Sequence, residues 1–279
     1  MYVKPQFAIS LLTPTRGRTE SLRRCVESAW SLADDANSVE FVFGLDQDDT
    51  VGQQYFDQQL VPWMQSVGVN FTALQFEPMG YLRLNEYVNQ LAHHSDSEWL
   101  MFWNDDAVME TQGWDTVIAS YTGEFLVLAV HANRDHPYSI FPIVPRQWLD
   151  ILGYISPHQI TDAWVSQQAY MLDIWHRIPV WVLHDRHDLT GNNGDSTFAN
   201  RPMLEGNPNN PADFHSGTQT LRRIKDSVRV ADWLRRTRGK DMTFFDNVIA
   251  GRQDPWEKLR ANDPNNQTMQ LRVNLPQTR

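Results

Sequence analysis

The most constraining feature of the sequence is a run of large apolar residues, Trp99 to Trp103, that ends in one amide and two carboxylates, Asn104, Asp105 and Asp106. A short apolar run bounded by polar residues is typical of a strand buried inside a sheet. The polar residues after such a strand emerge at the rim of the sheet, where open α/β folds bind their ligands. Because adjacent carboxylates repel one another and are costly to bury, the sequence predicts a cation or several hydrogen-bond donors beside them.

These residues alone allow two interpretations of Asp105 and Asp106, to which we give equal weight. Oxygen ligands of this kind suit Mg²⁺ or Mn²⁺, particularly when a substrate diphosphate supplies the remaining ligands. In the second interpretation, the two acids belong to an ordinary turn and cap the segment that begins at Thr111.

Segments with strand and helix patterns alternate from residue 7 to about residue 150. An amphipathic helix is predicted where apolar residues recur at helical spacing, at Leu22, Cys25, Val26, Ala29 and Trp30. Further strands are predicted at Phe7–Leu12, Val39–Leu45, Val69–Phe76 and Glu124–His131. The alternation predicts an α/β fold in which helices flank a layered, mostly parallel sheet.

Two prolines interrupt the extended segment from Ile140 to Pro145. Proline cannot donate to a ladder of strands, so we expect this segment at an edge of the sheet. The next residues, Arg146–Leu152, are predicted to form a short helix that ends at Gly153.

Composition narrows the class of protein. The formal net charge of −10 argues against a chain built wholly around polyanion binding. The single cysteine, Cys25, cannot form an intrachain disulfide and excludes a thiolate-cluster metal site, which suits a reducing compartment. No apolar run approaches the ~20 residues that span a bilayer, and the first residues lack the pattern of a secretory signal. We therefore expect a cytoplasmic location.

The composition changes near residue 200, where Asn207–Pro211 has the character of a linker. We therefore predict a catalytic domain over residues 1–199 and a helical or irregular extension over residues 200–279 that packs on or near it. Between Leu221 and Lys240 lie eight basic and two acidic residues, on a segment where Leu221, Ile224, Val228 and Ala231 keep helical spacing. The simpler interpretation is a solvated helix face, and the alternative is a surface for an acceptor, a nucleic acid or a membrane.

Polar residues also follow the first two predicted strands. The loop Thr13–Thr19 leads into a helix and carries Arg16 and Arg18, an arrangement that favours phosphate binding. Asp46 ends the second strand, where an acid can accept a hydrogen bond from a nucleobase or a ribose hydroxyl. The simpler alternatives are solvated arginines and an ordinary turn.

Candidate groups also occur later in the chain. Thr161 or Asp162 is predicted to be the N-cap of the helix that follows, and on spacing alone we prefer this capping role for Asp162. His184 and His187 follow a predicted strand and could offer an imidazole to a metal. Surface histidines are commoner than metal ligands, so this spacing by itself is a weak signal.

Taken together, four motifs resemble, in order and spacing, those of the family 2-like nucleotide-sugar glycosyltransferases of the GT-A fold: Thr13-Pro14-Thr15-x-Gly17-Arg18, the acids from Asp46 to Asp49, Gly80-x-x-Arg83-x-Asn85, and Asn104-Asp105-Asp106. The resemblance covers roughly residues 7 to 190. It implies a GT-A, Rossmann-like domain with a mixed, mostly parallel central sheet. It also implies that Asn104-Asp105-Asp106 occupies the place of the D-x-D metal motif.

The resemblance implies a role for each motif residue. Asp106 would ligate the metal, Asp105 would face the ribose or the sugar, and the amide of Asn104 is expected to hydrogen-bond rather than to ligate. The nucleoside would be held by Thr13, Pro14, Thr15, Arg16, Arg18 and Asp46, and the sugar or diphosphate by Arg83. Asp162 stands where inverting members carry their general base. His184 or His187 resembles the late histidine that contacts the metal or the diphosphate.

These expectations combine into one hypothesis, an inverting glycosyltransferase that uses Mn²⁺ or Mg²⁺ and moves a sugar from a UDP-sugar to a hydroxyl of a glycan or another acceptor. A sugar nucleotidyltransferase is a second hypothesis, but the loop from Thr13 to Thr19 has only one of the glycines that such an enzyme usually needs around a triphosphate. A third is a non-enzymatic module that binds glycans or nucleic acid. Acids at several strand ends disfavour nucleic acid, because carboxylates repel phosphates.

Overall fold

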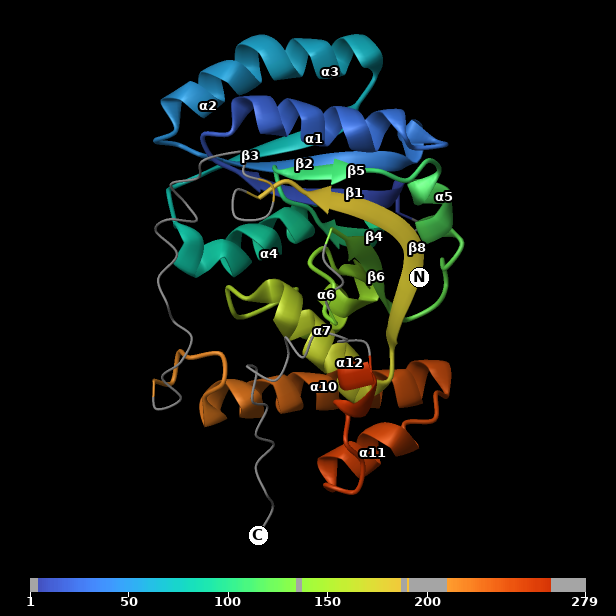
Figure 1. The fold of residues 1–279 in the computed structure, drawn as a ribbon. Helices are drawn as coiled ribbons and strands as arrows, with labels where there is room; N and C mark the ends of the chain where they lie inside the picture. The colour runs from blue at the N-terminus through green and yellow to red at the C-terminus, as the bar shows by residue number, and fades with distance from the viewer. Residues whose placement is uncertain (1–4, 134–136, 187–189, 191–209, 262–279) are drawn as a thin grey trace.

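The computed structural model describes residues 5–133, 137–186, 190 and 210–261 (Figure 1). Within these residues, eight strands form one sheet in the order β3-β2-β1-β4-β7-β6-β8-β5. Their bounds are β1 Phe7–Thr15, β2 Val39–Asp46, β3 Asn70–Phe76, β4 Ser97–Phe102, β5 Ala107–Met109, β6 Val127–Ala132, β7 Ile143–Pro145 and β8 Trp175–His184. The predicted α/β class is confirmed.

Strand direction makes the sheet mixed. β1 runs parallel to β2 and β4, β2 parallel to β3, and β6 parallel to β8, whereas β7 and β5 run antiparallel to their neighbours. The register pairs Thr15 with Leu45, Asp46 with Phe76 and Leu12 with Phe102. The carboxyl ends of β1, β2 and β4 therefore meet at one edge of the sheet, as the sequence predicts for the strands that precede the polar motifs.

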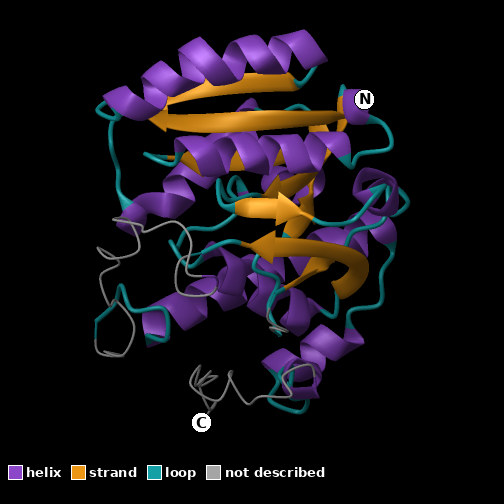
Figure 2. Ribbon diagram, turned by 45° about the horizontal axis from the view of Figure 1, so that its top comes forward, coloured by secondary structure: helices purple, strands orange, loops and turns teal. Residues whose placement is uncertain are grey.

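Helices cover both faces of the sheet (Figures 1 and 2). The helices of one side are α1 Thr19–Ser31, α2 Thr50–Tyr55, α3 Val61–Val67 and α5 Trp114–Ala119, and a π-helical turn, Phe56–Leu60, joins α2 to α3. The other side carries α4 Leu84–His94, α6 Arg146–Leu152 and α7 Thr161–Leu172. Each side has its own buried apolar cluster, so the sheet is sandwiched between two cores.

The described part of the C-terminal region is helical, with α10 Gly217–Arg238, α11 Thr243–Ile249 and α12 Glu257–Ala261. α10 contacts α6 and α7, and its Val230, Ala231 and Leu234 are buried in the same apolar cluster as α7. The predicted boundary between residues 199 and 200 lies outside the described residues. Within the described residues, no helix is long and apolar enough to cross a membrane.

One strand prediction is wrong. β7, within the segment from Ile140 to Pro145, lies between β4 and β6 in the middle of the sheet and not at an edge. The prolines are tolerated because β7 has only three residues. Pro142 lies just before the strand and its carbonyl accepts a hydrogen bond from the N–H of Phe102, at 3.1 Å, and Pro145 is the last residue of the strand. Neither proline is therefore needed as a ladder donor.

Of the two helix ends specified in the sequence analysis, the structure confirms one and contradicts the other. α6 ends at Gly153, which adopts the left-handed conformation with φ of 81°, as predicted. α7 has Ile160 as its N-cap, so the prediction of Thr161 or Asp162 is wrong. These two residues instead form the first turn of α7, and the side chain of Asp162 reaches only the neighbouring N–H of Ala163, at 2.8 Å.

Candidate active site

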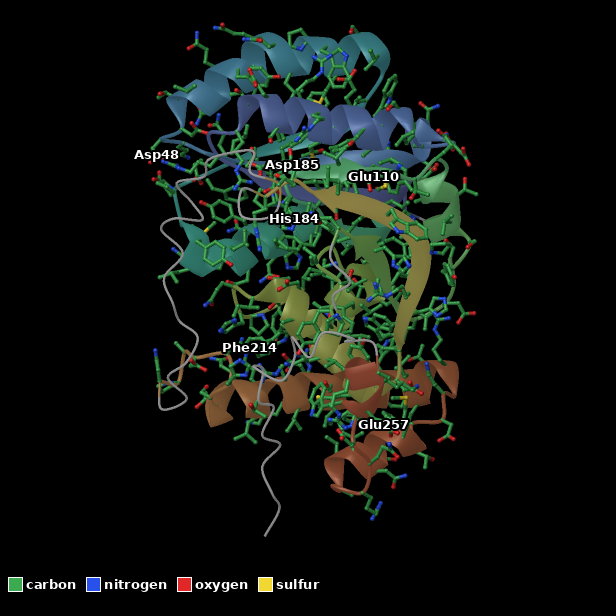
Figure 3. The ribbon with its side chains drawn as sticks, viewed as in Figure 1. Asp48, Glu110, His184, Asp185, Phe214 and Glu257 are labelled. Atoms are coloured by element: carbon green, nitrogen blue, oxygen red, sulfur yellow. The ribbon has the colours of Figure 1, made fainter. Side chains whose placement is uncertain are left out.

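A cavity opens at the edge of the sheet where β1, β2 and β4 end, with an empty volume of about 1140 Å³ that is partly open to solvent. Ten of the thirteen residues predicted for the site line it: Pro14, Thr15, Arg16, Arg18, Asp46, Asn104, Asp105, Asp106, Asp162 and His184. Figure 3 shows His184 and Asp185 at the end of β8, where that strand reaches the cavity.

Two predicted residues are not among the residues that line the cavity, and a third lies outside the described part of the chain. Thr13 is fully buried in β1 and its hydroxyl donates to the carbonyl of Leu11, at 3.3 Å. Arg83 is exposed and its guanidinium pairs with Glu86. His187 lies outside the described residues.

The carboxylates of Asp105 and Asp106, which follow β4, are buried beside Arg18, which lies in the loop between β1 and α1. Arg18 Nη1 lies 2.7 Å from Asp105 Oδ1 and 2.9 Å from Asp106 Oδ2. Thr15, at the end of β1, donates its hydroxyl to Asp105 Oδ2 at 2.8 Å. The cation and donor that the sequence predicts beside the acids are therefore both present.

The two acids differ in their proton affinity because their surroundings differ. Burial raises the pKa of Asp105 to about 6, and the neighbouring Asp106 adds to this rise while Arg18 opposes it. Burial acts in the same direction on Asp106, but His184 and Arg18 outweigh it and lower the pKa of that carboxyl. Asp106 is therefore the member of the pair that stays ionised most readily.

One carboxylate oxygen of the Asp105 and Asp106 pair lies next to the imidazole of His184. This oxygen, Asp106 Oδ1, is buried, has no hydrogen-bond donor within the described part of the chain, and lies 3.3 Å from His184 Nε2. The ring of His184 is held edge-on against Phe141, at 5.2 Å between centroids, and Asn104 Nδ2 lies 3.4 Å from its Nε2. Neighbouring ligands of an octahedral Mg²⁺ or Mn²⁺ with bonds of about 2.1 Å lie roughly 3 Å apart. Asp106 Oδ1 and His184 Nε2 thus fit a shared divalent cation.

The protein supplies only part of such a coordination shell. Among the described residues, no group of three or more His, Cys, Asp or Glu side chains is arranged to hold a metal ion. A cation at Asp106 and His184 would therefore need further oxygen ligands from water or from a bound ligand. Diphosphates commonly supply them.

A second acid, Asp46, lies at the end of β2 and is positioned from both sides. Arg16 Nη1 donates to its Oδ2 at 2.8 Å, and the hydroxyl of Tyr87 on α4 donates to its Oδ1. The same hydroxyl accepts the N–H of Met79 at 2.7 Å. Burial, followed by the hydrogen bond to Asp46, raises the pKa of Tyr87 to about 12, so the hydroxyl remains a donor at neutral pH.

The sequence analysis missed Tyr87 and several other lining residues. Tyr87 falls within the apolar stripe of α4, where an aromatic residue is ordinarily part of a core. The other lining residues were not assigned a role in the site from the sequence, and they are Gly80, Tyr81, Leu84, Phe102, Ile140, Gln159, Thr161 and Arg186.

Asp162 reaches the cavity from α7, a different layer from the other acids. Its Oδ1 accepts from the N–H of Ala163, and among the described contacts its Oδ2 has no hydrogen-bond partner. The side chain is half-buried, next to the buried Thr161 and Gln159. An oxygen of this carboxylate is therefore available to accept a proton.

No protein-family model matches the sequence. No curated protein matches it either. Solved structures do resemble it. The mannosyltransferase PcManGT from Pyrobaculum calidifontis, in complex with GDP-Man and Mn²⁺, superposes with a TM-score of 0.53 over 93% of this chain and 85% of its own, at 12% identity.

A second solved structure, S. aureus TarS 1-349 in complex with UDP-GlcNAc, superposes with a TM-score of 0.58 over 96% of this chain and 77% of its own, at 13% identity. A further structure of S. aureus TarS gives a TM-score of 0.56 over 96% of this chain and 46% of its own, at 12% identity. Identities this low establish only the fold. The chain therefore has the GT-A-type fold of these nucleotide-sugar glycosyltransferases, as the resemblance of its motifs predicts.

Proposed function

We propose that this protein is a glycosyltransferase that moves a sugar from a nucleotide sugar, with a UDP-sugar as the donor, to an acceptor hydroxyl. The observation that carries the proposal is the convergence of acids and bases from separate strands on one cavity. Asp46 follows β2, Asp105 and Asp106 follow β4, and His184 ends β8. The structural neighbours with this fold were solved with GDP-Man and Mn²⁺, with UDP-GlcNAc and with UDP.

The proposed donor occupies the cavity from the nucleoside end to the sugar end. Asp46 would accept a hydrogen bond from the base or the ribose, with the adjoining Pro14 and Thr15 as its wall. The guanidinium groups of Arg16 and Arg18 would contact the phosphates. Asp106 Oδ1 and His184 Nε2 would hold Mn²⁺ or Mg²⁺, which when bound neutralises charge that grows on the departing diphosphate.

We assign the general base to Asp162. In an inverting transfer, the acceptor hydroxyl attacks the anomeric carbon while the nucleoside diphosphate leaves from the opposite face, so a base must stand on the acceptor's side. The oxygen Oδ2 of Asp162 has no hydrogen-bond partner among the described residues and belongs to the cavity lining. It would take the proton of the attacking hydroxyl, and the C–O bond to the leaving phosphate oxygen breaks as the new glycosidic bond forms.

A thermal-unfolding screen of nucleotides and nucleotide sugars, with and without Mn²⁺, tests the proposal. A ligand that binds only the folded protein stabilises it by about 2.7 kcal/mol when its concentration is a hundred times its Kd. We expect uridine diphosphate nucleotides with Mn²⁺ to raise the midpoint by several degrees, and adenine nucleotides to raise it little. The proposal fails if no nucleotide sugar shifts the midpoint under either condition.

The same preparation separates the alternative functions. Release of pyrophosphate from UTP and a sugar phosphate would instead identify a sugar nucleotidyltransferase. Strong, salt-dependent binding to RNA or DNA without nucleotide-sugar binding would identify a nucleic-acid-binding module.

A further inference from the structure

The carboxylate oxygens of Asp105 and Asp106 are unequally supplied with hydrogen-bond donors. Arg18 Nη1 contacts Asp105 Oδ1 at 2.7 Å and Asp106 Oδ2 at 2.9 Å, and the hydroxyl of Thr15 occupies Asp105 Oδ2 at 2.8 Å. The fourth oxygen, Asp106 Oδ1, is buried and has no donor among the described residues. A divalent cation bound between this oxygen and His184 Nε2 would not need the three oxygens that already accept hydrogen bonds.

A cation at Asp106 Oδ1 would therefore leave Arg18 in place beside the two carboxylates and would not displace it. It is the N-cap residue of α1, its side chain is only 19% exposed, and it bridges both acids with one nitrogen. Two carboxylates and one guanidinium carry a net charge of −1, half of what the acids alone would present. Because the charges are buried, this compensation is only weakly screened by solvent.

We propose, on the basis of the proposed function, that Arg18 keeps the affinity of the free protein for divalent cations low and makes metal capture depend on a diphosphate. The described residues offer the cation one carboxylate oxygen and one imidazole, and the guanidinium of Arg18 lies on the other oxygen of the same carboxylate. A bound diphosphate supplies both the missing oxygen ligands and the negative charge that offsets Arg18 and the metal. Metal and nucleotide therefore bind as one unit, each raising the affinity for the other by the same factor.

The test is the affinity of the free protein for Mn²⁺, measured from the paramagnetic resonance signal of unbound Mn²⁺, without nucleotide and with saturating UDP. For the natural sequence we expect UDP to tighten Mn²⁺ binding at least tenfold. In Arg18→Gln, the loss of one buried positive charge should tighten Mn²⁺ binding to the free protein by roughly tenfold or more, and should shrink the effect of UDP. Arg18→Lys keeps the charge and should stay closer to the natural sequence.

Arg23→Gln is the matched control. Arg23 lies on the same helix, its guanidinium sits 3.6 Å from the centre of the Trp63 ring, and it contacts neither acid. This variant should bind Mn²⁺ like the natural sequence. Thermal unfolding of each variant checks that it is folded before the metal titration is interpreted.

Two results would overturn the proposal. The first is Mn²⁺ affinity in free Arg18→Gln that is unchanged or weaker than in the natural sequence. The second needs no variant, and it is Mn²⁺ binding to the natural sequence that is equally tight with and without bound UDP. Absence of any UDP binding in the presence of Mn²⁺ is a different outcome, because it contradicts the proposed function itself. The Mn²⁺ affinities of the natural sequence and of Arg18→Gln, both measured without nucleotide, would then decide the role of Arg18.

Discussion

At the scale of single residues, the candidate site depends on side chains that hold other side chains. Asp46 is the clearest case, because Arg16 fixes one of its oxygens and the Tyr87 hydroxyl fixes the other. Tyr87 also accepts the N–H of Met79, so one hydroxyl links α4 and the loop before it to the end of β2. The orientation of the acid is thus set before any ligand arrives, which lowers the cost of binding.

Tyr87→Phe tests this arrangement. The variant keeps the ring but removes the donor to Asp46 and the acceptor for Met79, two hydrogen bonds worth about 1 kcal/mol each. We expect the Kd for UDP to rise about five- to tenfold, with a small loss of thermal stability, as measured by isothermal titration in the presence of Mn²⁺. Tyr121→Phe is the control, since its hydroxyl contacts His176 instead. An unchanged Kd for UDP in Tyr87→Phe would remove Tyr87 from the account.

At the scale of elements, the sequence predicts most of what builds the site and misses what depends on distant partners. The strands β1, β2 and β4 coincide with short apolar runs and α1 with apolar residues at helical spacing, and these elements occur where predicted. The helical segment from α2 to α3 was not predicted. Gly52 and Pro62 are typical of helix ends, and the π-helical turn between α2 and α3 shifts the helical spacing of the apolar residues. β5 was not predicted because its strand partner within the described residues, β8, follows about seventy-five residues later.

The same limit applies to the residues of the site. Strand-end acids are visible in the sequence because strand ends themselves are predictable, and Asp46, Asp105 and Asp106 all line the cavity. Gln159 and Arg186 carry no local signal, because only the packing of separate layers brings them to the same cavity. Arg83 was predicted from its position in a motif, but a motif does not determine where a side chain points. In this structure the Arg83 side chain points to Glu86.

The first turn of α7 carries a prediction that separates catalysis from helix stability. Asp162→Asn retains Oδ1, the atom that accepts from the N–H of Ala163, so the helix start is preserved while the proton acceptor is lost. We expect nucleotide binding and thermal stability close to those of the natural sequence and a fall in kcat of about a hundredfold or more. A parallel loss of stability and activity would instead indicate that Asp162 serves only the helix.

At the scale of the whole molecule, the sheet and the C-terminal helices act as one support for the cavity. The sheet edge supplies the acids and His184, and α7 supplies Asp162. α10 packs on the far side of α7 and α6, so the described C-terminal helices hold the layer that carries the proposed base. The fold thus brings a proposed metal-binding edge and a proposed base, from two separate layers, to the same space.

The central claim is that Asp106 and His184 hold a divalent cation that binds the diphosphate of a nucleotide. Isothermal titration of UDP with and without Mn²⁺ tests it most directly. We would compare the natural sequence with Asp106→Ala and with the control Asp57→Ala, which removes an exposed acid on the π-helical turn that does not line the cavity. The account predicts that Mn²⁺ tightens UDP binding at least tenfold in the natural sequence and in Asp57→Ala, and that Asp106→Ala loses this effect. UDP binding that is the same with and without Mn²⁺, or an effect of Mn²⁺ that survives in Asp106→Ala, would contradict it.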